Sequence, residues 1–417
     1  MRLYWKLVFE IPWTEPKLDW LLKEFRLIVN KSIRVALEQR LHSRMRLARV
    51  AYAGFGREHN IYKQYIPSAF DFALRILKTY RRRLKQGKTA SVPYVRKPVL
   101  VAENQSYRLD RTTGRLRIPI RGTEGVQLVL PLSEWHRSIL EDPAWALGSL
   151  TVVPGRVVLA VRRTSPSAYE PVSAIALDTN EDSLDGVAVG SARARLTSLS
   201  FLGVREIQAR HFRRRRRLAR AKAQDRRVQR RLLARESARE RRRVKQRLHL
   251  VSKRLVQFAL ASKSAIVLEN LKLPSLHGRS RRMNRRLSSW PNREIHRQIE
   301  YKAALRGVPV IKVNPAWTSK TCPVCGARRR DRVGKDFVCL ICDWEMDRQH
   351  NAALNILKTA LASNEALARA VRFQPGALRD DVVSPLYDLL REGGGAREEP
   401  SGVELDAIPP FEISGDS

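Results

Sequence analysis

The sequence predicts a multidomain α+β protein, and three observations support that prediction. The chain has 417 residues, which is enough for two or three domains that each bury a core. Strand-like and helix-like segments alternate along it, and its four cysteines all lie within one short stretch. Hydrophobic residues make up 43% of the chain, an ordinary share for a globular protein, so these segments have enough apolar residues to pack.

The first part of the chain, residues 1–171, predicts a β domain with a helical insertion. Residues 2–11 have the pattern of a strand, and residues 14–88 carry apolar residues at helical spacing. Prolines then punctuate a strand-rich stretch that contains residues 115–120, 126–130 and 157–161. The order strand, helices, strands is the order expected when helices are inserted into a sheet.

The second part predicts the element order of the RNase H fold, a mixed sheet flanked by helices. Short apolar runs follow one another as in an antiparallel meander, and a long basic helical segment then precedes two further strands. In chain order we expect strands at 173–178, 186–190 and 196–201, a helix at 205–262, a strand at 265–270, a helix at 291–306, a strand at 308–313 and a last helix at 347–361.

Three acidic residues are placed on these elements in a pattern typical of a metal site. Asp178 ends the first strand, Glu269 ends the fourth, and Asp347 opens the last helix. In an RNase H sheet the first and fourth strands are parallel neighbours, so their carboxylates lie at one edge. Carboxylates held close together repel one another, and hard divalent cations such as Mg²⁺ or Mn²⁺ relieve that repulsion. The sequence therefore predicts a site for two such ions that hydrolyses a phosphodiester.

Each acid also has an ordinary structural interpretation. Asp178 and Glu269 are in positions that suit turn or loop residues, and Asp347 is in a position that suits a helix N-cap. Asp182 and Asp185 are nearby alternatives to Asp178, ranked lower because they lie in the turn after the strand. The occurrence of all three acids at the expected positions favours the metal site over three separate roles.

The four cysteines form two CxxC pairs separated by thirteen residues. This spacing is typical of a zinc ribbon, in which four thiolates hold one tetrahedral ion. Because all four ligands come from the protein, we expect the zinc to be structural. His350 is excluded as a ligand because it falls inside the last helix. The expected ligands are Cys322, Cys325, Cys339 and Cys342.

The charge of the chain indicates a polyanionic partner. It has 80 Lys and Arg residues against 41 Asp and Glu residues, a formal net charge of +39. Nucleic acid is the expected partner, because phosphates neutralise cations that otherwise repel one another. A membrane surface also attracts such a charge, but no apolar run approaches the roughly 20 residues of a spanning helix. No signal peptide is visible at the start, so we expect a cytoplasmic protein.

Two basic segments are candidate contacts for nucleic-acid phosphates. Nearly half of residues 205–254 are Arg or Lys, and an apolar stripe predicts that one face of this helix is buried. Residues 278–287 are also basic, and we expect a mobile loop that lines or gates the catalytic groove. A solvated charged face, or a disordered loop, is the alternative. The candidate contacts are Arg213, Arg214, Arg215, Arg216, Arg217, Arg241, Arg242, Arg243, Arg281 and Arg282.

The end of the chain, residues 363–417, is expected to be a tail. From Pro375 to Ser417 it holds ten acidic and three basic residues and a run of three glycines. The rest of the chain, with 77 basic and 31 acidic residues, then carries a net charge of +46. Because this stretch lacks apolar periodicity, we predict that it is disordered from about residue 375.

Four segments resemble the TnpB (OrfB) family, nucleases that are encoded by insertion sequences and are related to type V CRISPR effectors. The resemblance covers about residues 172–360, whereas residues 1–171 match in length and arrangement alone. The glycine that the family usually has after its first acid is replaced here by Thr179-Asn180-Glu181. The matching segments are AIALDTN (174–180), IVLENLK (266–272), YKAALRGVPVIKVNPAWTSKTCPVCG (301–326) and CLICDWEMDRQHNAALNIL (339–357).

The resemblance implies an RNA-guided DNA endonuclease of a transposable element, which cuts beside a short flanking motif. Asp178, Glu269 and Asp347 are its implied catalytic acids. Arg348 is a candidate to support them by stabilising phosphate charge, and a surface charge on the helix is the alternative. A noncoding guide RNA and target DNA are the implied partners, in a prokaryotic cell where the DNA-bound protein associates with the nucleoid. A monomer is favoured.

The resemblance also implies a layout of domains. The N-terminal β domain with its helical insertion becomes a wedge and recognition region, and the RNase H-like part becomes a RuvC domain with an inserted zinc ribbon. The implied boundaries are 1–171 for the wedge and recognition region, with its insertion at about 14–88, 172–313 for the RuvC-like domain, 314–345 for the zinc ribbon, 346–362 for the last RuvC segment and 363–417 for the tail.

Three other interpretations stay open. The first is a type V CRISPR effector, which differs in whether a repeat array or the ends of an insertion sequence lie beside the gene. The second is an RNA-guided DNA-binding protein or transposition regulator without cleavage, against which the presence of all three acids argues. The third is a zinc-ribbon nucleic-acid-binding protein, which leaves the placement of the acids unexplained.

Overall fold

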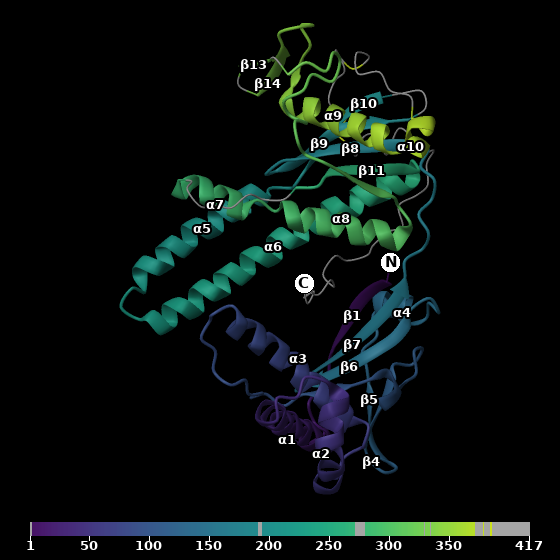
Figure 1. Cartoon of the computed structure of the whole chain (residues 1–417), viewed down its shortest axis with the longest axis vertical. Helices are drawn as coiled ribbons and strands as arrows, with labels where there is room; N and C mark the ends of the chain where they lie inside the picture. Colours follow the sequence, from purple (N-terminus) through teal and green to yellow (C-terminus); the bar gives the residue numbers. More distant parts are fainter. Residues whose placement is uncertain are drawn as a thin grey trace. The chain divides into compact units, whose positions relative to one another are not determined.

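The structure is a computed structural model of the chain, and it describes residues 2–190, 194–271, 280–328, 330–333, 335–371, 378 and 384–385. The chain folds into two compact units (Figure 1). One unit spans Arg2–Thr164, and the other begins at Ser165. The boundary therefore lies a few residues before the one that the sequence analysis places after residue 171.

The N-terminal unit contains a four-stranded antiparallel sheet in the order β1-β7-β6-β2. The first and last strands of the unit pair along their whole length, from Arg2 opposite Thr164 to Glu10 opposite Arg156. This pairing joins the two ends of the unit's sequence. The strands of this sheet are β1 (Arg2–Glu10), β2 (Leu100–Ala102), β6 (Ala146–Val153) and β7 (Arg156–Thr164).

Three helices lie in the sequence between β1 and β2, where the helical insertion is predicted. Leu18, Leu21, Leu22 and Phe25 recur at helical spacing on the first of them and are fully buried. This apolar face packs against the third helix, so the insertion has its own core. The helices are α1 (Pro16–Glu38), α2 (Arg44–Glu58) and α3 (Tyr65–Lys85).

A small antiparallel sheet follows in the order β3-β4-β5. Leu116, Ile118 and Ile120 alternate with exposed or half-buried residues along its central strand and are buried, as expected for a strand with one face on a core. Its strands are β3 (Arg108–Leu109), β4 (Arg115–Arg121) and β5 (Glu124–Val129), and a 3₁₀ turn η1 (Asn104–Ser106) and a helix α4 (Glu134–Leu140) lie on either side in the sequence.

The second unit is built on a mixed six-stranded sheet in the order β12-β11-β8-β9-β10-β16. The first three strands in sequence form an antiparallel meander, and β11 pairs in parallel with β8 on one side and β12 on the other. The predicted parallel pairing of the first and fourth strands is therefore confirmed. The strands are β8 (Ser173–Thr179), β9 (Ser183–Val189), β10 (Ala194–Ser200), β11 (Ser264–Glu269), β12 (Val310–Val313) and β16 (Ser384–Pro385).

Helices cover both faces of this sheet (Figure 1). Ala174 and Ala176 of β8 belong to the core under α9 (Arg348–Ser363), whereas Ile175 and Leu177 belong to the core under α6 (Arg226–Ala261) and α8 (Asn292–Arg306). This division follows from the strand period of two, since successive side chains point to opposite faces. A short helix, α10 (Glu365–Ala370), continues from α9 and adds Leu367 to the first core.

The basic segment forms two helices rather than the single one predicted. They are α5 (Val204–Ala221) and α6 (Arg226–Ala261), which pack side by side as a hairpin (Figure 1). Asp225 begins the second helix, because its carboxylate accepts a hydrogen bond from the Val228 amide at 2.9 Å.

Among the helices in the described ranges, none is long and apolar enough to cross a membrane.

The prediction of a basic loop at 278–287 is wrong where the structure describes this segment, because Arg281–Ser289 form a helix, α7. Ser280 caps its N-terminus by accepting from the Met283 amide at 3.2 Å. The helix lies against the hairpin, since Arg285 stacks on the Phe212 ring at 4.3 Å. Residues 272–279 lie outside the described residues.

A three-stranded antiparallel sheet precedes α9 and carries part of the predicted zinc ribbon. Phe337 and Trp344 of this ribbon are buried in the same core as α9. Helix α8 (Asn292–Arg306) packs on α6 on the other side of the unit. The ribbon strands are β13 (Arg330–Val333), β14 (Asp336–Cys339) and β15 (Glu345–Asp347).

The prediction of disorder from about residue 375 is wrong at three positions. Leu378 is 1% exposed and belongs to the core under α9. Ser384 and Pro385 form β16, which pairs in parallel with Thr197 and Ser198 of β10. An apolar side chain and a strand edge therefore bind this part of the chain to the second unit. The other residues from 375 onward lie outside the described residues.

Candidate functional site

The predicted acids lie on one face of the second unit's sheet. In β8 the even-numbered residues face α9, and in β11 the odd-numbered residues Ala265 and Val267 do so. By the strand period of two, Asp178 and Glu269 point to the α9 face as well. Leu177 pairs with Leu268, so the two acids follow paired positions on neighbouring strands. Asp347 stands at the N-terminus of α9, the helix that covers this face.

Asp185 joins this group although the sequence analysis ranked it below Asp178. It is the direct cross-strand partner of Asp178 and is 5% exposed. Burial, together with the charges of Glu269 and Asp185, raises the pKa of Asp178 to about 7. Its acidic neighbours thus destabilise the charged form of Asp178.

Hydrogen bonds hold Asp185 in place. Its Oδ2 accepts from Asn180 Nδ2 at 2.8 Å, and the hydroxyls of Ser183 and Ser198 donate to its two oxygens. Asn180 belongs to the Thr179-Asn180-Glu181 segment that departs from the TnpB pattern. This departure therefore supplies a donor to the acidic site.

Glu269 is held by a residue of the loop after β12. The Thr318 hydroxyl donates to Glu269 Oε1 at 2.6 Å, and both residues are nearly inaccessible, at 6% and 5% exposed. Burial raises the pKa of Glu269, and the bond from Thr318 opposes that rise. Thr318 therefore orients this carboxylate and stabilises its charged form.

Asp347 is the N-cap of α9, which is the ordinary structural role that its position in the sequence suits. Its Oδ1 accepts from the Gln349 amide at 2.8 Å and the His350 amide at 3.4 Å, and His350 Nδ1 lies 3.5 Å from it. Burial raises the pKa of Asp347, but the bonds from His350 and Gln349 outweigh burial and leave the pKa lowered. Arg348 lies near enough for its charge to lower the pKa of Asp178.

The acids supply only oxygen donors, which suit a hard divalent cation. The repulsion that Glu269 and Asp185 exert on Asp178, which contributes to its raised pKa, is the kind that such a cation relieves. Their oxygens do not all converge within 4.8 Å of one another in the part of the chain that the structure describes. The donor chemistry fits the predicted cation, whereas the side chains are more widely spaced than a closed site requires.

The four cysteines do converge, with all their sulfur atoms within 4.8 Å of one another. Cys322 Sγ lies 3.6 Å from Cys342 Sγ, and Cys325 Sγ lies 3.6 Å from Cys339 Sγ. Zinc–sulfur bonds of about 2.3 Å in a tetrahedron place sulfurs about 3.8 Å apart. These four residues therefore fit a structural zinc ion. His350 contacts Asp347 and is not one of this group, in agreement with its exclusion as a zinc ligand.

The turn after the first cysteine pair brings backbone amides to the sulfurs. Gly326 has a φ of +77°, a conformation that glycine adopts without strain. The Ala327 amide that follows lowers the pKa of the Cys325 thiol to about 7. Zinc binds the thiolate, so a thiol that ionises readily suits a zinc ligand.

The predicted phosphate contacts are mainly exposed. All of them except Arg215 are exposed on α5, α6 or α7. Arg215 instead pairs with Glu240, and Arg214 lies 3.5 Å from Glu236, which is buried against His211. These two glutamates of α6 face α5 and join the hairpin. Among the described residues, Arg213, Arg216, Arg217, Arg241, Arg242, Arg281 and Arg282 have no acidic partner.

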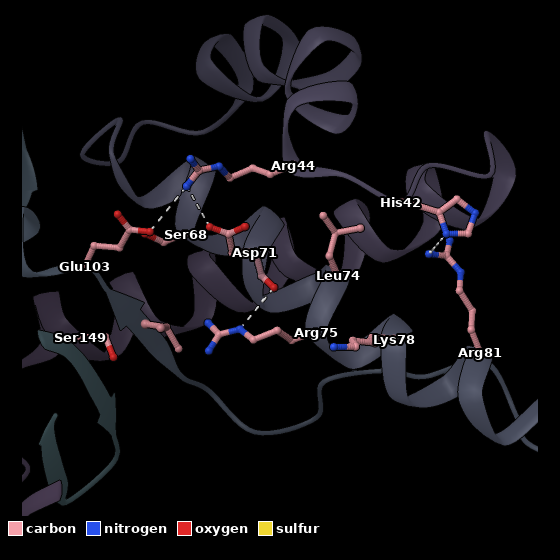
Figure 2. Close-up of a pocket in the computed structure, with 11 residues that line it drawn as sticks. His42, Arg44, Ser68, Asp71, Leu74, Arg75, Lys78, Arg81, Glu103 and Ser149 are labelled. Carbon is pink, nitrogen blue, oxygen red and sulfur yellow. Dashed lines mark hydrogen bonds and ion pairs between the residues drawn. The ribbon is translucent and has the colours of Figure 1, made fainter. Parts of the chain in front are cut away.

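A cavity of about 640 Å³ lies in the N-terminal unit, which does not contain the acids. Most of its cations are engaged (Figure 2): Arg44 pairs with Asp71 at 3.0 Å and Glu103 at 3.7 Å, and Arg81 lies 3.0 Å from His42 Nδ1. Lys78 also lines the cavity. The lining has four cations and two acids, and both acids pair with Arg44, so the cavity is polar and keeps a positive charge, unlike the acidic site.

Two protein families match parts of the chain. The Cas12f1-like TNB domain family matches residues 293–356, which include nearly all of α8, the four cysteines and Asp347. The uncharacterized protein MJ0013 family matches residues 21–119, which lie in the N-terminal unit. Both units thus have relatives of known sequence.

Two curated relatives match with similar strength. The chain is 34% identical over 118 residues to the TnpB-like protein MJ0751 of Methanocaldococcus jannaschii, covering 28% of this chain and 42% of that protein. The chain is related to the TnpB family. It is also 31% identical over 131 residues to the CRISPR-associated endodeoxyribonuclease Cas12f2 of a Micrarchaeota archaeon, covering 28% and 24%. The aligned part therefore spans less than half of either relative.

A solved structure resembles this chain in its fold. The chain aligns over 82% of its length with 81% of the Cas12f1 chain in a cryo-EM complex with sgRNA and target DNA. The TM-score is 0.54 and the sequence identity is 16%. The chain therefore has a multidomain α/β fold like that of the Cas12 proteins, which are type V effectors.

Proposed function

We propose that this chain is an RNA-guided DNA endonuclease whose RuvC-like site hydrolyses phosphodiesters with two divalent metal ions. In this proposal the N-terminal unit is a wedge and recognition region, and the second unit is the nuclease with its zinc ribbon. The names of the relatives, a TnpB-like protein and a Cas12f2 endodeoxyribonuclease, support this class of activity.

The observation that carries the proposal is the placement of acids on the α9 face of the sheet. Asp178, Asp185 and Glu269 come from neighbouring strands, and Asp347 begins the helix above them. Ordinary turn and cap roles do not require four acids to share one face of a sheet. Burying like charges side by side costs free energy, so such a group is a candidate for function.

In the proposed site, Asp178, Glu269 and Asp347 hold the cations, and Asp185 is an additional candidate ligand. Bound divalent ions lower the pKa of water and stabilise the oxygen that leaves the phosphodiester. Thr318 orients Glu269, and the N-cap bonds leave Asp347 with a fixed rotamer. Arg348 is placed to offset negative charge beside Asp178.

The exposed arginines of the helical hairpin and α7 support a nucleic-acid role. Arginine binds phosphate through paired donors and positions a backbone without reading its bases. Guide pairing reads the target sequence in RNA-guided nucleases, so backbone contact is what the protein must supply. A charge of +46 outside the acidic tail suits a bound RNA together with DNA.

The test is to express the chain with its native flanking sequence and to sequence the RNA that copurifies. With the guide segment reprogrammed, matched double-stranded DNA should be cut in the presence of Mg²⁺ and mismatched DNA should not. Equal cutting of both targets, and cutting after RNase treatment, would leave a nonspecific nuclease instead. Matched binding without cutting would point to an RNA-guided binder or transposition regulator.

A further inference from the structure

A strained turn connects β12 to the zinc ribbon. Trp317 has a φ of +71°, in the left-handed region that side-chain-bearing residues rarely adopt. Its carbonyl accepts from the Lys320 amide at 2.9 Å, the Thr321 amide at 3.1 Å and the Thr321 hydroxyl at 3.0 Å. The turn therefore forces the tryptophan backbone into this conformation.

The side chains of two asparagines in α9 donate hydrogen bonds to the same turn. Asn355 Nδ2 donates to the Thr318 carbonyl at 2.9 Å and to the Thr321 carbonyl at 2.7 Å. Asn351 Nδ2 also donates to the Thr321 carbonyl, at 3.1 Å. Both side chains are buried, at 7% and 0% exposed. Strain of this kind persists only where the surroundings over-determine it, and it is concentrated at functional sites.

The turn sends two adjacent side chains in different directions. Thr318 points inward and donates to Glu269, whereas Trp317 is 51% exposed. An indole is thus held in solvent one residue away from the partner of a proposed catalytic acid. Burying a tryptophan is favourable, so its exposure by a strained backbone needs a compensating role.

Two cations lie against this indole. The Arg328 guanidinium is 4.4 Å from the ring centroid, and Lys320 Nζ is 5.3 Å from it. Neither cation has an acidic partner among the described residues. The ring orients these side chains by cation–π attraction, which leaves their N–H groups able to donate to phosphate.

We propose that Trp317, Arg328 and Lys320 form a subsite for single-stranded nucleic acid beside the acidic site. A base stacks on the exposed part of the indole, and flanking phosphates bind the two cations. A single strand is the expected ligand because its bases have free faces, whereas those of a duplex are already stacked. The identity of the strand, as the one cut by the acids, rests on the proposed function.

The test uses photocross-linking in the Asp178→Ala chain, which does not need cleavage. A single-stranded DNA oligonucleotide that contains 5-iododeoxyuridine is irradiated on the protein, and cross-linked peptides are identified by mass spectrometry. The peptide that contains Trp317 should be labelled. Trp317→Gly should reduce that labelling by about 5- to 100-fold, as loss of one stacking contact predicts, and Trp317→Tyr should retain most of it.

Trp317→Gly separates binding from folding, because glycine adopts a positive φ without strain. Its zinc content and Tm should equal or exceed those of the parent chain, whereas a structural role for the ring would lower the Tm. Leu340→Ala is the matched control, since Leu340 is 59% exposed in the same ribbon. It should leave the labelling unchanged.

Two results separate this subsite from the proposed function. Labelling at Trp317 in a protein that cuts no guided target would keep the subsite and reject the nuclease. Guided cutting by the unmodified chain, together with labelling that is equal in Trp317→Gly and its parent or absent from the Trp317 peptide, would reject the subsite and keep the nuclease.

Discussion

At the scale of single residues, the acidic site depends on the partners of each carboxylate. Asp178 faces Asp185 across a strand pair, Glu269 accepts from Thr318, and Asp347 caps a helix. Each acid thus has a different electrostatic environment, which is visible in raised pKa values for Asp178 and Glu269 and a lowered one for Asp347. Substitutions at these positions should therefore separate chemistry from folding.

We predict that Asp178→Ala, Glu269→Ala and Asp347→Ala each abolish cleavage while guided DNA binding is largely kept, because bridging metal ions needs all three acids. Cleavage and binding of one matched target by purified variants at physiological Mg²⁺ would measure this. Asp182→Ala, whose side chain is about half exposed and only 3.8 Å from Arg205, is the control and should cut normally. Full activity in any of the three variants would remove that residue from the assignment.

Thr318→Val should lower the cleavage rate by about 10- to 100-fold, the usual effect of removing a partner that orients a metal ligand. Valine keeps the shape of threonine but cannot donate to Glu269. Thr359→Val is the matched control, because its hydroxyl donates to the Asn355 carbonyl at 2.8 Å and does not contact the acids. Equal rates for the two variants would show that Thr318 does not position Glu269.

At the scale of elements, the zinc ribbon and the strand β16 both stabilise the layer that carries Asp347. The ribbon contributes Phe337 and Trp344 to the core under α9, and the later chain contributes Leu378. Damage to either should therefore reach the acidic site through α9 rather than by direct contact.

We expect about one zinc ion per chain, measured by elemental analysis of purified protein. Cys322→Ser should lower the zinc content and the Tm, since structural zinc contributes directly to folding free energy. Cleavage should fall with them because Asp347 is displaced. Val324→Ala, an exposed residue between two of the ligands, should change neither. Soluble, active protein without zinc would contradict this prediction.

Shortening the chain to Pro385 should leave its stability nearly unchanged, whereas removing residues 376–417 should cost about 2–5 kcal/mol, the range for losing a buried leucine and its packing. Thermal unfolding of the two truncated proteins would measure the difference. Leu378→Ala in the full chain should reproduce most of the loss. Equal Tm values for both truncations would show that Leu378 and β16 add no stability.

At the scale of the whole molecule, the net charge of +39 affects both the stability of the fold and the kind of partner it binds. The ion pairs described above neutralise a minority of the cations, and the helical hairpin is held together by Glu236 and Glu240 among many unpaired arginines. Uncompensated charge of one sign destabilises a compact state through self-repulsion. A bound polyanion should therefore stabilise the protein as well as direct it.

RNase treatment of the purified complex should lower its Tm, and added salt should restore part of the loss. A ligand present at 100 to 1,000 times its Kd stabilises the folded state by about 3–4 kcal/mol. The measurement is thermal unfolding before and after treatment, at low and moderate ionic strength. A Tm that is independent of RNA would show that RNA is not an integral partner.

The sequence by itself determined most strands of the second unit's sheet and the candidate residues on them. Local patterns can be recognised without knowledge of the fold, and they include the apolar runs, the CxxC spacing and the positions of the three acids. The break between α5 and α6 was missed because Arg and Lys are good helix formers on both sides of it, and the Asp225 cap decides where the second helix begins.

Only the tertiary structure decided which groups meet. Asp185 faces Asp178 because a hairpin register pairs them, and Thr318 reaches Glu269 because α9 asparagines hold its turn. Leu378 and β16 are placed by a core and a sheet edge that distant segments build. Such contacts depend on packing between elements far apart in the chain, and periodicity along the chain carries no information about them.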